Sequence, residues 1–184
     1  IYQCDWSSDV CSSDLGVDRF MVGDTVFGFG GGVGGLQGSQ AQYGAFDARL
    51  LASKPASLSM QEASVLPLVA ITAWEGLIDR AQVKAGQTVL IHGGAGGVGQ
   101  VAVQIALARG AKVFATDFAD ELDYVRGLGA VAIDATSDVS SYVAEHTGGQ
   151  GFDLVYDTVG GPVLDASFAA VRRFGHVVSC LGWG

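Results

Sequence analysis

Basic residues, cysteines and long apolar runs are scarce in this chain, and each shortage excludes a class of protein. The sequence has 10 Lys and Arg against 19 Asp and Glu, a formal charge of −9, whereas a general nucleic-acid binder needs a basic face for the phosphates. Three cysteines without a Cys-x-x-Cys pair provide neither a disulfide framework nor a metal motif. No apolar run reaches the ~18 residues that a membrane span requires. We therefore expect no nucleic-acid partner and no membrane association.

Apolar residues and glycine are plentiful instead. Hydrophobic residues make up 49% of the 184 positions, charged residues 16%, and there are 28 glycines, a composition that excludes wholesale disorder. The length fits one ordinary domain, or a domain with part of another, and suffices to bury a core. These features predict a glycine-rich α/β protein that works in the cytoplasm.

Residues 1–15 stand apart from the rest of the sequence. They show no strand alternation, no helical apolar stripe and no basic n-region of a signal peptide. The run IYQCDWSSDVCSSDL is similar to a sequencing-library adaptor translated in one frame, and we interpret it as an artefact. A natural disordered terminus is the alternative. Without this run Cys180 is the only cysteine, so cysteine usage says nothing about the redox compartment.

Strand and helix signals follow this terminal run. A strand signal covers 25–27, and apolar alternation predicts another strand within 41–51. The glycine-rich segment between them, Gly28–Gly38, predicts a loop, with a mobile lid over a substrate as the alternative.

A capping box predicts the start of the first helix. Ser59 and Glu62 have the spacing at which each side chain caps the other residue's N–H. Pro67 has no N–H to continue the helical ladder, so we expect a break there and a second helical piece over 70–81.

Strand signals alternate with helix signals from residue 86 onward. Continuous apolar runs such as Thr88–His92 are typical of parallel strands that are buried on both faces. This alternation predicts stacked βαβ units in a doubly wound parallel sheet. A dinucleotide-binding sheet has six strands in its full form, and because five are visible we expect the last strand to be missing. The predicted strands and helices are, in chain order, 88–92, 98–108, 112–116, 120–128, 130–133, 139–146, 152–156, Pro162 towards Arg173, and 176–181.

Two stretches match the pattern Gly-x-Gly-x-x-Gly. No helix follows Gly30–Gly35, so we interpret that match as a product of glycine density. Gly94–Gly99, which reads GAGGVG, follows a predicted strand directly and opens a predicted helix, as the motif requires. The N-terminus of that helix would offer N–H groups and a positive dipole to phosphates. We therefore predict nucleotide binding, with a tight turn that holds no ligand as the alternative.

Each glycine of the second match has an expected task. Gly94 allows the tight turn, Gly96 lets the backbone approach a pyrophosphate, and Gly99 lets the helix pack close to the strand. An acid about 20 residues further on binds the ribose hydroxyls in such sites, and Asp117 takes that place. A helix cap is its alternative role, and the two are compatible. A carboxylate repels a 2′-phosphate, which favours NAD(H) over NADP(H), although Arg126 is a nearby cation.

The glycine motif belongs to a longer run, AGQTVLIHGGAGGVG over 85–99, preceded by Leu66-Pro67-Leu68 and Thr72-Ala73-Trp74. Together with Val22–Phe27 and Asp157–Gly161, this combination resembles the medium-chain dehydrogenase/reductase superfamily, and most of all its quinone oxidoreductase branch. The resemblance implies a GroES-like β-barrel domain, present only as its last part, and a Rossmann domain without its final strand. The implied division is 1–15 artefact, 16–60 partial barrel, 61–81 connecting helices and 82–184 Rossmann domain.

The resemblance also implies the residues that bind a cofactor. It places the glycine motif at the pyrophosphate, Asp117 at the adenine ribose, and Thr72 with the Asp157–Gly160 loop near the nicotinamide. Leu181 and Gly182, at the end of the fifth strand, would lie under the same ring. The residues predicted to bind NAD(P)H, with NADH mildly favoured, are Thr72, Gly94, Ala95, Gly96, Gly97, Val98, Gly99, Asp117, Asp157, Thr158, Val159, Gly160, Leu181 and Gly182.

Residue 68 indicates whether the protein binds a catalytic zinc. Zinc-dependent alcohol dehydrogenases of the superfamily have a cysteine ligand in the segment before Thr72, where this sequence has Leu68. The other candidates have no paired spacing, and we interpret them as packing or surface residues: His92, His146, His176 and Cys180. We therefore expect no zinc. Hydride would pass from the nicotinamide to a quinone or an activated enone, with the protein positioning the reacting carbon.

No catalytic residue is assigned. Tyr43 is a conceivable acid, but it lies in a predicted strand and we interpret it as structural.

The alternatives to a reductase are a zinc-dependent alcohol dehydrogenase of the same superfamily and an inactive nucleotide-binding fragment. We expect a small-molecule carbonyl or quinone substrate and a homodimer for the full-length protein. We expect this chain alone to be poorly soluble and inactive, because the missing strand leaves an open sheet edge and the partial barrel leaves apolar residues such as Val22, Val26 and Phe27 without partners.

Overall fold

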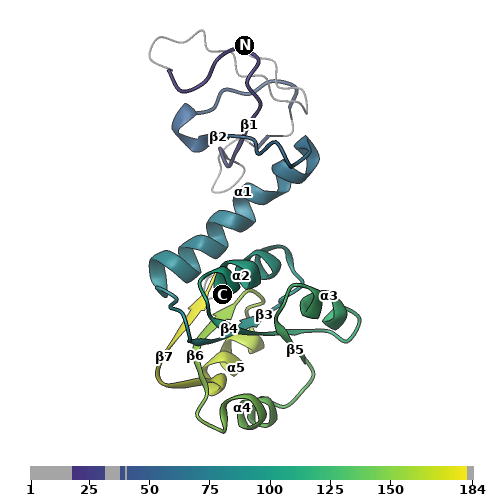
Figure 1. Cartoon of the computed structure of the whole chain (residues 1–184), viewed down its shortest axis with the longest axis vertical. Helices are drawn as coiled ribbons and strands as arrows, with labels where there is room; N and C mark the ends of the chain where they lie inside the picture. Colours follow the sequence, from purple (N-terminus) through teal and green to yellow (C-terminus); the bar gives the residue numbers. More distant parts are fainter. Residues whose placement is uncertain (1–17, 32–37, 40, 182–184) are drawn as a thin grey trace. The chain divides into compact units, whose positions relative to one another are not determined.

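The structure is a computed structural model that describes residues 18–31, 38–39 and 41–181 (Figure 1). The chain divides into two compact units, Ile1–Leu68 and Val69–Gly184, which we describe separately. The interpretation of residues 1–15 as an artefact lies outside the described residues, as do Gly182 and most of the Gly30–Gly35 match. None of the described helices is long and apolar enough to cross a membrane.

The first unit contains one antiparallel strand pair. Strand β1 (Val26–Gly28) pairs with β2 (Leu51–Ser53), which confirms the strand signal over 25–27 to within one residue. The predicted strand within 41–51 is mostly wrong, because a short 3-10 turn, η1 (Ala48–Leu50), occupies its end. The side chain of Asp47 accepts a hydrogen bond from the Arg49 N–H and so offers this backbone an alternative to a strand ladder.

A long helix, α1 (Met60–Trp74), crosses the division between the units. The capping box is confirmed, since the Ser59 N–H donates to Glu62 Oε2 at 2.8 Å and the Glu62 N–H donates to Ser59 Oγ at 3.2 Å. The expected break at Pro67 is wrong. Proline removes one hydrogen bond from the ladder, and the bonds on either side of it keep the helix continuous. The predicted second piece is the end of α1 and the π-helical turn that follows it, η2 (Glu75–Arg80).

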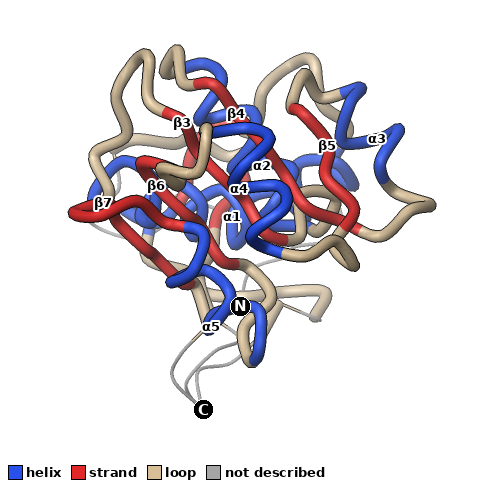
Figure 2. The backbone as a smooth tube through the Cα atoms, turned by 90° about the horizontal axis from the view of Figure 1, so that it is seen from below, coloured by secondary structure: helices blue, strands red, loops and turns tan. Residues whose placement is uncertain are grey.

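The second unit is built on a five-stranded parallel sheet in the order β5-β4-β3-β6-β7, which confirms the predicted doubly wound fold (Figure 2). Within the described residues, no sixth strand pairs with β7. The predicted helix towards Arg173 ends early, because β7 begins at Val171 and an irregularity between Phe152 and Leu154 shifts its register. The elements are β3 (Thr88–His92), α2 (Gly97–Ala108), β4 (Lys112–Asp117), α3 (Leu122–Gly127), β5 (Val131–Asp134), α4 (Val139–Thr147), β6 (Phe152–Asp157), α5 (Pro162–Ala170) and β7 (Val171–Ser179).

Both faces of this sheet are covered by apolar packing. Alternate residues of β3 contribute to two clusters, Val89 and Ile91 to one and Leu90 to the other. The first cluster includes residues of α2, and the second includes residues of α4 and α5. Burial on both faces explains why β3 reads as a continuous apolar run. The buried polar side chains of the strands lie at carboxyl ends: His92, Thr116 and Asp157.

Candidate functional site

The loop between β3 and α2, which we call the glycine loop (Gly93–Gly96), needs glycine for packing. An added Cβ would lie 2.6 Å from Ala115 Cβ at Gly94, and 1.9 Å from the Gly93 carbonyl oxygen at Gly99. The close packing expected of Gly99 is therefore present in the structure. The left-handed residue of the turn is Gly93, with φ 75°, so the tight turn expected at Gly94 lies one residue earlier.

The N-terminus of α2 presents exposed backbone. Gly96 and Gly97 are exposed, and no side chain caps this 12-residue helix. The neighbouring side chains of Ala95 and Val98 pack against the core instead. The first N–H groups of a helix have no partner within the helix, and with the helix dipole they favour an anion. This end of α2 is therefore a candidate anion-binding end.

Asp117 lies at the same loop, on the end of β4. Its Oδ2 accepts a hydrogen bond from the Ala95 N–H at 2.8 Å, and its Oδ1 accepts one from the Phe118 N–H at 2.9 Å. The side chain is partly exposed, and each carboxylate oxygen can accept a further bond. Arg126, the cation that could have favoured a 2′-phosphate, pairs with Asp123 at 2.5 Å.

The loop after β6, which we call the Asp157 loop (Asp157–Gly160), carries its own anion. The Asp157 carboxylate is fully buried and accepts from the N–H groups of Val159 and Gly160, both at 3.0 Å. It also accepts from the Ser179 hydroxyl at 2.9 Å. At Gly160, with φ +78°, an added Cβ would lie 2.9 Å from Leu181 Cδ1. The structure thus brings Leu181 against this loop.

The two loops are adjacent. An added Cβ on Gly93 would lie 2.8 Å from Thr158 Oγ1 and 3.0 Å from Val159 Cγ2. The Thr158 hydroxyl donates to the carbonyl of His92 at 2.6 Å. The predicted residues Gly94–Gly99, Asp117, Asp157–Gly160 and Leu181 therefore meet at the carboxyl edge of the sheet.

Thr72 is tied to this edge through its main chain. Its carbonyl accepts a hydrogen bond from the Tyr156 hydroxyl at 2.9 Å, and Tyr156 is the penultimate residue of β6. Burial raises the pKa of the Tyr156 phenol, so the hydroxyl stays a donor. The ring also fills the space above Gly76, where an added Cβ would meet it at 2.6 Å.

Sequence reasoning treated His92 as an ordinary packing residue and did not predict its buried contact with Thr116. His92 is 3% exposed, and its Nδ1 lies 2.8 Å from Thr116 Oγ1. Its Nε2 has no hydrogen-bond partner among the described residues. Burial lowers the pKa of His92 to about 4, against an opposing effect of Asp157, so the ring is neutral at neutral pH. A polar residue that ends an apolar strand directly before a glycine motif was the available signal.

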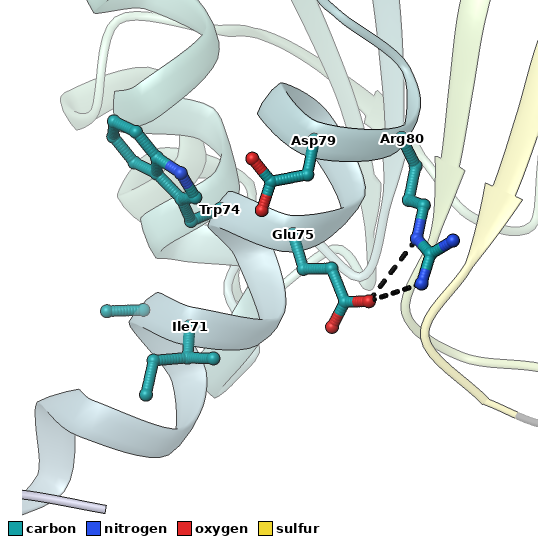
Figure 3. Close-up of a pocket in the computed structure, with 6 residues that line it drawn as sticks. Ile71, Trp74, Glu75, Asp79 and Arg80 are labelled. Atoms are coloured by element: carbon teal, nitrogen blue, oxygen red, sulfur yellow. Dashed lines mark hydrogen bonds and ion pairs between the residues drawn. The ribbon is translucent and has the colours of Figure 1, made fainter. Parts of the chain in front are cut away.

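A shallow depression lies on α1 and η2, and none of the residues predicted to bind a cofactor lines it (Figure 3). Its apolar side is formed by Ile71 and Trp74, about half exposed. Arg80 lies at its edge and pairs with Glu75 at 2.8 Å.

Comparisons with known proteins agree with this geometry. The family described as zinc-binding dehydrogenase matches residues 97–182. A solved structure of an alcohol dehydrogenase superfamily protein from Novosphingobium aromaticivorans is 74% identical, with a TM-score of 0.89 over 91% of this chain and 51% of that one. The chain belongs to the medium-chain dehydrogenase/reductase superfamily.

Within the superfamily the chain is quinone oxidoreductase-like. A quinone oxidoreductase from Pseudomonas syringae is 34% identical, with a TM-score of 0.75 over 88% of this chain and 49% of that one. The 2-methylene-furan-3-one reductase of Solanum lycopersicum is 38% identical over 79% of this chain and 36% of its own length. Several polyketide synthases match 85–87% of this chain but only 7–10% of their own length. The chain spans about half the length of the solved relatives.

The name of the matched family suggests zinc, but the described part of the chain contains no site that fits this metal. There, no group of three or more His, Cys, Asp or Glu side chains could hold a metal ion. His146 instead lies against the ring of Phe114, with centroids 5.1 Å apart. Cys180 is partly buried, and burial raises the pKa of its thiol above the ordinary value. A catalytic zinc needs three protein ligands, which these residues do not supply.

Proposed function

We propose that this chain is the cofactor-binding part of an NAD(P)H-dependent reductase that passes hydride to a quinone or an activated enone without a metal. The observation that carries the proposal is the uncapped start of α2, where Gly96 and Gly97 expose backbone close to the carboxylate of Asp117. An anion-binding helix end beside an acid on the next strand is the arrangement that a dinucleotide needs.

The cofactor would lie along the carboxyl edge of the sheet. We assign the pyrophosphate to Gly94–Gly99 and the adenine ribose to Asp117. We assign the nicotinamide half to Thr72, the Asp157 loop, Leu181 and Gly182. The contact between Gly93 and Thr158 supports this assignment, because it makes the two loops one continuous edge.

The charges around Asp117 favour NADH over NADPH. Asp120 and Glu121 follow on the exposed stretch after β4, and Asp123 occupies the one cation nearby, Arg126. A 2′-phosphate would therefore face carboxylates and no unpaired base in the described stretch from 117 to 126, which is unfavourable at short range.

The chemistry would be supplied by the reduced nicotinamide, a hydride donor at C4. The chain's part is to hold that ring against the sheet edge through the Asp157 loop and to exclude water. The acceptor is a carbon made electrophilic by conjugation to a carbonyl. Hydride forms a new C–H bond there, the electrons move onto the carbonyl oxygen, and a proton from water or from a residue outside this chain completes the reduction. The names of two relatives, a quinone oxidoreductase and a furanone reductase, support this acceptor class.

We also make proposals about the domains and the oligomeric state of the whole protein. We propose that residues 16–60 are part of a GroES-like barrel domain, 61–81 connecting helices and 82–184 a Rossmann domain, and that the full-length protein is a homodimer. Because the solved relatives are about twice as long, we expect most of the substrate walls to lie outside this chain. The chain alone should then bind the cofactor and turn over little substrate.

Titration of the purified chain with NADH and NADPH, followed by nicotinamide fluorescence, tests this proposal. We expect micromolar binding of NADH and weaker binding of NADPH. No binding of either cofactor would end the proposal. Oxidation of NADH by 1,4-benzoquinone or methyl vinyl ketone, measured with the full-length protein in the presence of a chelator and against a protein-free control, would test the acceptor class.

A zinc-dependent alcohol dehydrogenase is the second candidate, because the matched family is described as zinc-binding. An assay of the full-length protein distinguishes the two. Oxidation of a primary alcohol by NAD⁺ that a chelator abolishes and zinc restores would favour the dehydrogenase.

A further inference from the structure

His92 and Thr116 form a buried cross-strand pair at the last residue of β3. The register places His92 opposite Thr116 on β4, and the ring Nδ1 lies 2.8 Å from the threonine Oγ1. Both side chains are buried, at 3% and 5% exposure. A hydrogen-bonded pair at the final rung of two strands resists fraying of their ends.

The strand end that this pair secures holds the glycine loop. The carbonyl of Thr116 accepts hydrogen bonds from the N–H groups of Gly93 and Gly94, at 2.9 and 3.0 Å. The next residue, Asp117, accepts from the Ala95 N–H at 2.8 Å. Three successive N–H groups of the loop are thus bound by two successive residues of β4.

His92 also contacts the other loop through its main chain. Its carbonyl accepts from the Thr158 hydroxyl at 2.6 Å. The side chain and the main chain of one residue therefore bond to both sides of the candidate site, to β4 on one side and to the Asp157 loop on the other. The neutral ring adds no charge near the phosphates, so its effect on binding has to be geometric.

We propose that His92 is a positioning residue which, through Thr116, fixes the glycine loop against Asp117 and so sets the affinity of the adenosine-diphosphate half of the cofactor. This inference rests on the proposed function, since it requires a dinucleotide at this edge. It gives a positioning role to His92, a buried residue that takes no part in the proposed hydride transfer.

Calorimetric titration of the full chain with ADP-ribose, and separately with nicotinamide mononucleotide, tests the proposal. Thr116→Val and His92→Leu remove the side-chain bond. We expect each to weaken ADP-ribose about three- to tenfold, the range of one hydrogen bond. Nicotinamide mononucleotide should change less than twofold. The double variant should be little weaker than either single variant, because both remove the same interaction.

Conservative variants and a matched control separate positioning from general destabilisation. Thr116→Ser keeps the hydroxyl, and His92→Asn keeps a polar atom near the Nδ1 position, so both should bind ADP-ribose within about twofold of the original chain. Leu90→Ala removes buried apolar volume from the same strand and should lower the unfolding temperature without changing ADP-ribose affinity below it. If His92→Leu does not fold, Thr116→Val carries the test.

Two negative results are distinguishable. If the unsubstituted chain binds no ADP-ribose, the proposed function fails, and this inference with it. If it binds ADP-ribose and Thr116→Val binds equally well at a temperature where both are folded, only the role of His92 is overturned. An equal loss of both half-ligands would also overturn it, because a structural role predicts that pattern.

Discussion

The glycine loop and the Asp157 loop occupy equivalent places, each after a central parallel strand and before a helix, yet they satisfy their backbones differently. After β3, the loop N–H groups bond to β4, and the start of α2 is left exposed with no side-chain cap. After β6, the loop N–H groups bond to the buried carboxylate of Asp157, and α5 begins with Pro162, which has no N–H.

The difference shows how one topology produces two kinds of site. The helix end after β3 has no side-chain cap, and under the proposed function its N–H groups would bind the pyrophosphate. The loop after β6 contains its own anion and is therefore held in one shape before any ligand arrives. A prepared surface of that kind suits the positioning of a flat ring.

Removal of the internal anion should have the largest effect. Asp157→Ala leaves two N–H groups and the Ser179 hydroxyl without their buried acceptor, and we expect a loss of about 4 kcal/mol in the free energy of unfolding. Urea unfolding measures it. Asp165→Ala, an exposed acid of α5, is the matched control and should cost below ~1 kcal/mol. Equal effects of the two variants would show that Asp157 does not hold its loop.

Closing the space at the start of α2 should have the next largest effect. In Gly99→Ala the new Cβ would lie 1.9 Å from the Gly93 carbonyl oxygen, so the helix must move away from the loop. We expect a loss of about 2–3 kcal/mol in stability and no detectable NADH binding. Gly127→Ala, on α3 with no atom within 4 Å of the new Cβ, is the control and should be neutral or stabilising. Unchanged NADH affinity in Gly99→Ala would place the cofactor elsewhere.

The sequence predicts the glycine loop better than the Asp157 loop, for a physical reason. Gly94–Gly99 is a local pattern, so strand, turn and helix can be read together. The three groups that donate to the Asp157 carboxylate lie in its loop and on β7, and only the pairing of the strands brings Ser179 there. The family resemblance predicts that Asp157 lies on the nicotinamide side of the cofactor site. Nothing in the sequence indicates that its carboxylate is fully buried.

Other differences also arise from tertiary context. Proline chemistry alone predicts a break at Pro67, whereas the helix of 15 residues absorbs one missing bond. The early start of β7 follows from pairing with Phe152, which lies far from Val171 in sequence. His92 reads as one more residue of an apolar strand, and its importance depends on Thr116 lying opposite it.

Mild acid should destabilise the chain through His92, at the junction of the two loops. Its pKa is about 4 in the folded state against 6.5 as the reference value, so the unfolded state binds more protons between these limits. Stability is unaffected well above pH 6.5 and falls as the pH drops from 6.5 towards 4, by about 1.4 kcal/mol at pH 5.5. Urea unfolding at pH 7.5 and 5.5 should show this difference, and His92→Asn should lack it. An equal pH dependence in that variant would assign the effect to another group.

The charge of Asp117 should contribute a smaller effect, on selectivity. Asp117→Asn keeps an acceptor for the Ala95 N–H and loses the negative charge, so we expect NADPH affinity to rise about fivefold relative to NADH. Asp117→Ala also loses the bond to the loop, and both cofactors should then bind more weakly. Fluorescence titration gives the two ratios. If Asp117→Asn left the NADH-to-NADPH ratio unchanged, the preference would not come from this carboxylate.

Metal removal should have the smallest effect, because no group of side chains in the described parts of the two loops could hold a metal ion. The Asp157 carboxylate already accepts from three donors, and Asp117 accepts from the backbone of the glycine loop and of Phe118. Incubation with a chelator should shift the unfolding temperature by less than about 1 °C, and NADH affinity should not change. Elemental analysis of the purified chain should find well below one zinc per molecule. Stoichiometric zinc, or a large drop in unfolding temperature that added zinc reverses, would contradict the metal-free proposal and favour the zinc-dependent dehydrogenase.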